Sequence, residues 1–214
     1  MTTNNTKERL LEIATEMIWR NSYCSVSVDD ICKAAGVHKG SFYHYFKSKA
    51  DLAFSCMDRK SNEAVGMMDR VFSPRKHPIQ RIFDLGEEVL FHQREIQKRF
   101  GQVCGCPFMT LASEMVGHDT EGLYTKSDQV SRMLETYYIC LVRDLIAQGY
   151  LSDNIDAVSR GEETYRYVVG MVMVARIQNS LEAVERDLIT GLIRIVGLRD
   201  EDVESFLQGK KLTA

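Results

Sequence analysis

The sequence predicts an all-α protein. Only 3 of its 214 residues are proline, and apolar side chains recur along most of it at helical spacing, with little strand-like alternation. The hydrophobic fraction of 44% is enough for a substantial core, and the charged fraction of 27% is typical of a soluble protein. We therefore expect one or two helical domains.

Three helices are expected at the N-terminus. The segment TKERLLEIATEMIWRN has its apolar residues at helical spacing, with Thr6 as the expected N-cap. A second helix should begin after Ser27, which has Asp30 three residues later in a capping-box arrangement, and should end at Gly36. A third, very short helix is expected over residues 39–46.

Six further helices are expected in the remainder. They should run from Ser48 as N-cap to about Phe72, from Pro78 to about Arg99, over PFMTLASEMV with Pro107 near its start, from the loop GHDTEG to about Gln148, from Asp156 to about Ser180, and from Leu181 to about Val196. The glycine-rich FGQVCGC is expected to be irregular.

The second and third helices fit a helix-turn-helix. Ala35 is small where two helices cross, Gly36 reverses the chain and Val37 fills the corner. At about 100° per residue, Phe42 and Phe46 fall together and should point inward. The residues expected largely opposite them are Gly40, Tyr43, His44 and Lys47, with Ser41 at the border.

The outward residues suit contact with DNA. Lys39 lies at the N-terminal end of the short helix, where major-groove readers contact base edges, and Gly40 lets the backbone approach closely. Tyr43 can place its ring on a thymine methyl or its hydroxyl on a phosphate. Lys49 lies in the first turn of the next helix, where free N–H groups favour a phosphate. The alternative is a small helical cap with an exposed aromatic patch.

The stretch SVDDICKAAGVHKGSFYHYFKSKADL resembles the DNA-binding signature of the TetR family of bacterial repressors, over about a quarter of the chain. The resemblance implies a nine-helix, all-α homodimer, with a DNA-binding domain over residues 1–47 and a ligand-binding and dimerisation domain over residues 48–214. It places the DNA contacts on Ser27, Lys39, Gly40, Ser41, Tyr43, His44, Tyr45 and Lys49. The family often has His where this chain has Tyr45, with His44 beside it, so either ring is a candidate for the phosphate contact.

Charge and composition agree with this reading. Through Lys60 the chain has nine Lys and Arg against seven Asp and Glu, a net +2, while the remainder carries −5. A slightly basic head suits an anionic partner. The polar N-terminus and the lack of any apolar run near 20 residues predict a cytoplasmic protein with no membrane segment. We expect reduced thiols.

The segment CGCPFMTLASEM resembles a stretch in a subgroup of the family that includes an electrophile-sensing repressor, whose sensing cysteine falls on Cys106. Cys106 directly precedes Pro107 at an expected helix start, where a thiolate is stabilised and its pKa lowered. Cys104, two residues earlier, is a candidate for resolving a sulfenic acid on Cys106. A structural role for Cys106 is equally open. Cys104 and Cys106 with His118 lack a further ligand for a tetrahedral metal site, so we expect no metal.

The other cysteines are interpreted as structural or unassigned. Cys32, Cys56 and Cys140 are expected in the core, and no function is readable for Cys24. Candidates for an inducer pocket include His92, Phe108 and Tyr138, although aromatic residues at helical spacing more often form core.

The last two helices should form the homodimer, with Gly170, Ala175 and Gly191 permitting close helix contact. Two DNA-binding domains, one from each subunit and spaced about 34–36 Å apart, would read a palindromic double-stranded operator. The function expected is a repressor released by a small-molecule or electrophilic inducer through Cys106; the alternative is noncovalent inducer binding alone. No cofactor motif is present, and Ser113, Glu114 and His118 are not a credible triad, so an enzyme is not expected.

Overall fold

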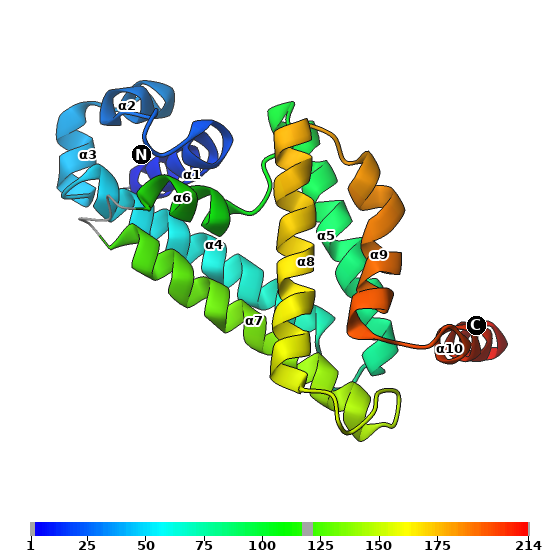
Figure 1. The fold of residues 1–214 in the computed structure, drawn as a ribbon. Coiled ribbons are helices and arrows are strands. Elements are labelled where there is room, and N and C mark those ends of the chain that lie inside the picture. The colour runs from blue at the N-terminus through cyan, green and yellow to red at the C-terminus, as the bar shows by residue number, and fades with distance from the viewer. Residues whose placement is uncertain (1–2, 117–121, 214) are drawn as a thin grey trace. The chain divides into compact units, whose positions relative to one another are not determined.

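The computed structural model describes residues 3–116 and 122–213, and within these ranges it contains ten helices and no strand (Figure 1). The helices are α1 (Thr3–Asn21), α2 (Val28–Ala35), α3 (Lys39–Tyr45), α4 (Lys49–Val71), α5 (Pro78–Phe100), α6 (Pro107–Met115), α7 (Leu123–Ala147), α8 (Ala157–Gln178), α9 (Glu182–Val196) and α10 (Asp200–Thr213). The predicted all-α class is confirmed.

Most helix boundaries follow the predicted capping residues. The Ser48 hydroxyl accepts the N–H of Asp51 at 3.1 Å at the start of α4, and α5 and α6 each begin at a proline. The assignment of Thr6 as an N-cap is wrong, because α1 already begins at Thr3.

The tenth helix, α10, was not expected. It follows Gly197 closely, has acidic residues in its first turn, and buries or half-buries Val203 and Phe206 at helical spacing. Those features were available in the sequence, but the surrounding charge concealed the short apolar face.

The chain divides into two compact units. The first contains residues up to 65 together with 106–131, and the second contains 66–105 and the residues from 132 onwards. This division by compactness differs from the functional division predicted between residues 47 and 48, because α6 and the start of α7 belong with the N-terminal helices. The helices α4 and α7 each contribute to both units.

In the first unit, α1 packs on α2 and on α6, and α2 packs on α3 (Figure 1). The core of this unit includes Leu10, Trp19 and Leu52. An ion pair of 2.7 Å between Lys126 and Asp58 joins α7 to α4. The helix-turn-helix and α6 are therefore parts of one body.

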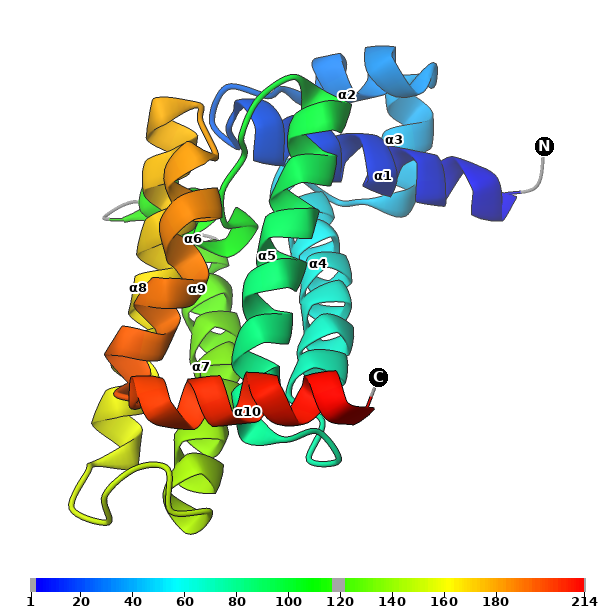
Figure 2. The ribbon, with the colours of Figure 1, turned by 90° about the vertical axis from the view of Figure 1, so that its right-hand side faces the viewer.

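In the second unit, α8 and α5 both pack against α9 (Figure 2). Gly86 of α5 has the side chain of Ile189 where a Cβ would stand, and Gly191 of α9 has the Tyr167 ring there. The Tyr167 hydroxyl also donates to the carbonyl of Asp187 at 2.9 Å. The close helix contact expected at Gly191 is therefore present, and it is made within the chain, between α9 and α8.

Side-chain contacts join α5 to α7 and to α10 within the second unit. The buried Arg81 guanidinium of α5 lies 2.5 Å from the Asp144 carboxylate of α7. The His77 ring, at the N-cap of α5, stacks on Phe206 of α10 at 4.8 Å and lies 3.0 Å from the Tyr150 hydroxyl.

Candidate functional site

The start of α2 is fixed by a reciprocal capping box. The Ser27 hydroxyl accepts the N–H of Asp30 at 3.1 Å, and the Asp30 carboxylate accepts the N–H and the hydroxyl of Ser27 at 2.9 and 2.6 Å. The hydroxyl bond, then the backbone bond, holds the pKa of Asp30 below its usual value. A phosphate that approached Ser27 would compete with Asp30 for the hydroxyl proton.

The turn between α2 and α3 depends on Gly36. Its φ of 62° and ψ of 39° place it in the left-handed region, where glycine is strongly favoured. Its N–H contacts the carbonyls of Cys32 and Lys33, and the N–H of Val37 donates to Cys32 at 3.0 Å. Ala35 is buried, whereas Val37 is half-buried. The predicted corner is therefore present.

The short helix α3 has the two faces that its sequence predicted. Phe42 and Phe46 are buried, with ring centroids 5.9 Å apart. Tyr43 is 56% exposed, His44 is exposed, and a Cβ at Gly40 would meet no atom within 4 Å. The surface available to a partner, called here the α3 face, is formed by Lys39, Gly40, Tyr43 and His44; the predicted contacts Ser41 and Tyr45 are half-buried beside it.

The two lysines predicted to meet DNA are placed differently. Lys39 is exposed and forms an ion pair of 2.7 Å with Asp29, and hydrogen bonding to that carboxylate raises the pKa of Lys39. Lys49 is half-buried, and its ammonium donates to the carbonyls of Tyr23 and Val26 at 3.1 and 3.2 Å. It also lies 4.2 Å from the centroid of the Tyr23 ring. An ammonium has three donors, and Lys49 uses two of them to fasten the loop before α2, so its contact with a phosphate stays a prediction.

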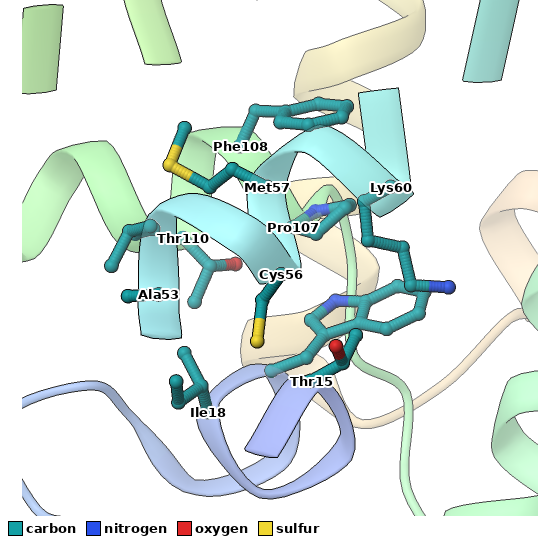
Figure 3. A pocket seen from close by; sticks show the side chains of 11 residues that line it. Thr15, Ile18, Ala53, Cys56, Met57, Lys60, Pro107, Phe108 and Thr110 are labelled. Atoms are coloured by element: carbon teal, nitrogen blue, oxygen red, sulfur yellow. The ribbon is translucent and has the colours of Figure 1, made fainter. Parts of the chain in front are cut away.

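An apolar cavity of about 30 Å³, partly open to solvent, lies in the first unit between α1, α4 and α6 (Figure 3). Its lining residues are Thr15, Ile18, Trp19, Ala53, Cys56, Met57, Lys60, Pro107, Phe108, Thr110 and Leu111. Of the predicted pocket residues, Phe108 belongs to this wall. The Lys60 ammonium lies 4.8 Å from the Trp19 ring centroid and 2.7 Å from the Glu63 carboxylate.

The cavity walls from α1 and α4 were not predicted. The sequence places Trp19 and Met57 on apolar helix faces, which is the pattern of ordinary core. Nothing in that pattern shows that the three helices leave a space between them.

Cys106 is the N-cap of α6 and is half-buried. Burial raises the pKa of its thiol, and the backbone N–H groups of Met109 and Phe108 act in the opposite direction without overcoming it. The prediction of a lowered pKa at this position is therefore wrong. The helix terminus acts as expected, but the loss of solvent is the larger effect.

Cys104 is fully buried in the second unit, whereas Cys106 belongs to the first. The carbonyl of Cys104 accepts a hydrogen bond from Arg176 of α8 at 2.6 Å, and its sulfur lies 3.7 Å from the carbonyl of Gln102. Its backbone thus fastens the segment before α6 to α8.

The remaining pocket candidates do not come together. Tyr138 is buried in the second unit, where its ring lies 5.2 Å from Phe72 and 5.4 Å from Tyr165, in an aromatic core. His92 is exposed on α5, beside Phe91, which is 62% exposed. The structure therefore does not support His92 as a polar group inside a pocket, because its helix turns it outward.

The other cysteines divide by exposure. Cys32 and Cys56 are buried as expected, and burial raises the pKa of Cys56 to about 11. The core assignment of Cys140 is wrong, because α7 exposes it; Cys24 is exposed too.

His118, considered for a metal site and for a triad, lies outside the described residues. In the described part of the chain, no three His, Cys, Asp or Glu side chains gather closely enough to hold a metal ion. Ser113 donates to the carbonyl of Thr110 at 2.8 Å, and Glu114 binds the loop after α1. Neither faces the other as a catalytic pair would.

Comparison with known proteins adds a family to this geometry. Residues 10–56, which span the helix-turn-helix and the start of α4, match the family described as bacterial regulatory proteins, tetR family. The chain is a TetR-family transcriptional regulator. The matching residues include the capping box, the glycine turn and the α3 face. The relatives and structural neighbours of this TetR-family chain are transcriptional regulators and not enzymes.

Two curated relatives illustrate the range of similarity. The HTH-type transcriptional repressor NemR of Escherichia coli K12 is 23% identical over 87% of this chain and 92% of its own. The transcriptional regulator AcuR of Cereibacter sphaeroides is 38% identical, over 30% of each chain. The AcuR match thus spans less than a third of either protein.

Solved structures share the fold across nearly the whole chain. A TetR regulatory protein from Rhodobacter sphaeroides has a TM-score of 0.73 at 26% identity, covering 89% of this chain and 96% of its own. A TetR-family regulator from Agrobacterium tumefaciens reaches 0.80 at 21% identity, covering 90% and 98%. The reduced form of E. coli NemR reaches 0.74 at 20% identity, covering 91% and 99%. The last two show the fold alone.

No helix among residues 3–116 and 122–213 combines the length and the apolar character needed to span a lipid bilayer.

Proposed function

We propose that this chain is a homodimeric repressor that binds a palindromic operator through the α3 face and leaves it when a small molecule acts on α6. The proposal of operator binding rests on the α3 face. Phe42 and Phe46 anchor the helix, while Tyr43 and Lys39 project outward. A rigid short helix with exposed basic and aromatic groups suits the major groove. The cytoplasm, where such an operator is found, is the expected location.

Tyr43 provides the test of this surface. A duplex selected from a random library by the wild-type protein serves as the operator. Tyr43→Ala should weaken binding to that duplex by about ten-fold or more, while binding to unselected DNA should change little. Tyr124→Ala, at an exposed tyrosine of α7, is the matched control. Equal operator affinity for wild type and Tyr43→Ala would remove the α3 face from the proposal.

Exposed apolar residues on α8 support the dimer. Ile177 is 82% exposed, Val174 is exposed three residues earlier, and a Cβ at Gly170 would meet no atom within 4 Å. Residues 170, 174 and 177 recur at helical spacing and therefore share one face. Large exposed aliphatic side chains of this kind commonly mark an interface. Ile177→Glu should produce monomers in sedimentation velocity, and Leu207→Glu, at an exposed leucine of α10, should not.

Two kinds of trigger remain for the inducer. The electrophile trigger rests on Cys106 at the N-cap of α6; the noncovalent trigger rests on the apolar cavity beside Phe108 of the same helix. The raised pKa of Cys106 favours the noncovalent trigger, because a buried thiol holds less of the reactive thiolate. At about 30 Å³ the cavity must widen to admit an organic molecule, which would displace α6.

The two triggers are separated by challenging the operator complex with N-ethylmaleimide. Under the noncovalent trigger, N-ethylmaleimide should release the Cys106→Ser protein from the operator to the same extent as the wild-type protein. Small carboxylates or aromatic compounds should raise the Tm of both proteins equally. Cys24→Ser and Cys140→Ser are needed as controls, since both of these thiols are exposed. Release that Cys106→Ser alone abolishes would establish the electrophile trigger.

A further inference from the structure

One carboxylate joins α6 to the loop that precedes the helix-turn-helix. The Oε2 atom of Glu114, near the end of α6, accepts the hydroxyl of Ser22 at 2.8 Å and the N–H of Cys24 at 3.0 Å. The partners are about 90 residues apart in sequence and lie in the same compact unit. Hydrogen bonds to an ionised carboxylate are stronger than those between neutral groups.

The loop that Glu114 holds contains a backbone conformation that serine rarely adopts. Ser22 has a φ of 143°, and among described non-glycine residues only Asn179 shares a positive φ. Such a conformation costs about 1–3 kcal/mol and persists where the surroundings hold it. One hydrogen bond to Glu114 comes from the Ser22 hydroxyl and the other from the N–H of Cys24, two residues later. The Ser25 hydroxyl also donates to the Ser22 carbonyl at 3.2 Å.

The same loop leads directly into the DNA-binding helices. Residues 22–26 end at Ser27, the N-cap of α2, and α2 packs on α3. Lys49 holds the same loop from α4, through the carbonyls of Tyr23 and Val26. The position of α2 therefore depends on two attachments, one to α4 through an ammonium and one to α6 through a carboxylate.

We propose that Glu114 is a positioning residue for operator binding. Its carboxylate fixes the α1–α2 loop, and through α2 it fixes the orientation of the α3 face. Glu114 lies on the same nine-residue helix as Cys106 and Phe108, so an inducer that displaces α6 breaks its bonds to the loop. This inference rests on the proposed DNA-binding function and names the contact through which that function is regulated.

Four variants test the proposal in the full-length protein. Glu114→Ala removes the acceptor, and Glu114→Gln keeps an amide oxygen that accepts both bonds. Ser22→Ala removes the hydroxyl donor, and Ser22→Gly removes it while suiting the positive φ, so it also guards against a loss of folding. Glu95→Ala, at an exposed glutamate of α5, is the matched control.

Operator affinity is measured with the duplex selected by the wild-type protein, alongside unselected DNA and the Tm of each variant. Glu114→Ala should weaken operator binding about ten-fold, and Glu114→Gln, whose neutral oxygen forms weaker bonds, should recover part of the loss. Ser22→Ala should add little further loss in the Glu114→Ala background, because both changes remove one interaction. Ser22→Gly should weaken operator binding without lowering the Tm more than Glu95→Ala does.

The outcomes separate this inference from the function on which it rests. If the wild-type protein selects no duplex, the proposed DNA-binding function fails and the inference fails with it. If it selects a duplex that Glu114→Ala binds equally well, only the role of Glu114 is overturned. Purely additive losses for Ser22→Ala and Glu114→Ala, or no recovery in Glu114→Gln, would likewise contradict a direct attachment.

Discussion

Alkylation of the native protein with iodoacetamide at pH 8 should modify the cysteines in an order set by burial. Cys24 and Cys140 are exposed and should react first, and the half-buried Cys106 and the buried Cys56 should both react more slowly. The reactive species is the thiolate, so the rate follows the fraction ionised as well as access to the sulfur. The order tests whether the environment of α6 activates its cysteine or protects it.

The expected slowing of alkylation can be calculated for Cys56. A thiol with the ordinary pKa of 9.0 is about 10% ionised at pH 8, whereas a pKa of about 11 leaves ~0.1%. Ionisation alone therefore slows Cys56 about 100-fold relative to an ordinary thiol, before any steric protection. For Cys106 the direction is the same, because burial outweighs the N–H groups at the start of α6.

The assay is a time course quenched with acid. Unreacted thiols are then labelled with heavy iodoacetamide in denaturant, and the ratio of light to heavy label is read for each peptide by mass spectrometry. Protein alkylated in concentrated guanidinium gives the unprotected rate of each cysteine. Modification of Cys106 as fast as Cys24 would refute the argument from burial and restore the electrophile trigger. Equal rates for Cys56 and Cys24 would mean that the cavity wall opens freely.

Three further substitutions test contacts that stabilise each unit internally. Ser27→Ala should lower the free energy of unfolding by about 1 kcal/mol in a urea titration, because it removes the cap of α2; no change would deny the capping box a role in stability. Asp144→Ala should cost about 2 kcal/mol by the same measurement, since it leaves the buried Arg81 guanidinium without its carboxylate, and a loss near zero would contradict that. Burial and the nearby Arg81 hold the pKa of His77 below the ordinary 6.5, so the unfolded chain binds the proton more readily and stability should fall as pH drops below about 6.5. His77→Asn retains a capping acceptor at the start of α5 and should flatten that pH dependence, as followed by Tm; an unchanged profile would assign the effect to another group.

The fold was largely predictable because its boundaries depend on local chemistry. Gly36 supplies a positive φ, and Pro78 and Pro107 fit only the first turn of a helix, so each marks a boundary whatever surrounds it. The orientation of Phe42 and Phe46 followed from the helical period alone. The α3 face could therefore be named from the sequence with its inward and outward residues correctly assigned.

What the sequence did not reveal depends on contacts between distant segments. No local sequence pattern links Glu114 to Ser22. Nor does any pattern indicate that the Lys49 ammonium donates to two loop carbonyls. The pKa of Cys106 was predicted in the wrong direction for the same reason. A helix start is visible in the sequence, whereas burial by the rest of the unit is not.

The proposed release from the operator needs only a small displacement, because the cavity wall and the loop contact lie on one short helix. Phe108 and Glu114 are six residues apart on α6, about 9 Å along its axis, so the helix carries a displacement from the cavity wall to the carboxylate as a rigid body. Apolar contacts weaken gradually with distance, but a hydrogen bond at 2.8–3.0 Å is largely lost once it exceeds about 3.5 Å. A shift of well under one helical turn would therefore leave the core of the unit packed while detaching the loop. An inducer need only prefer the detached arrangement, since it shifts the equilibrium by its difference in affinity for the two states.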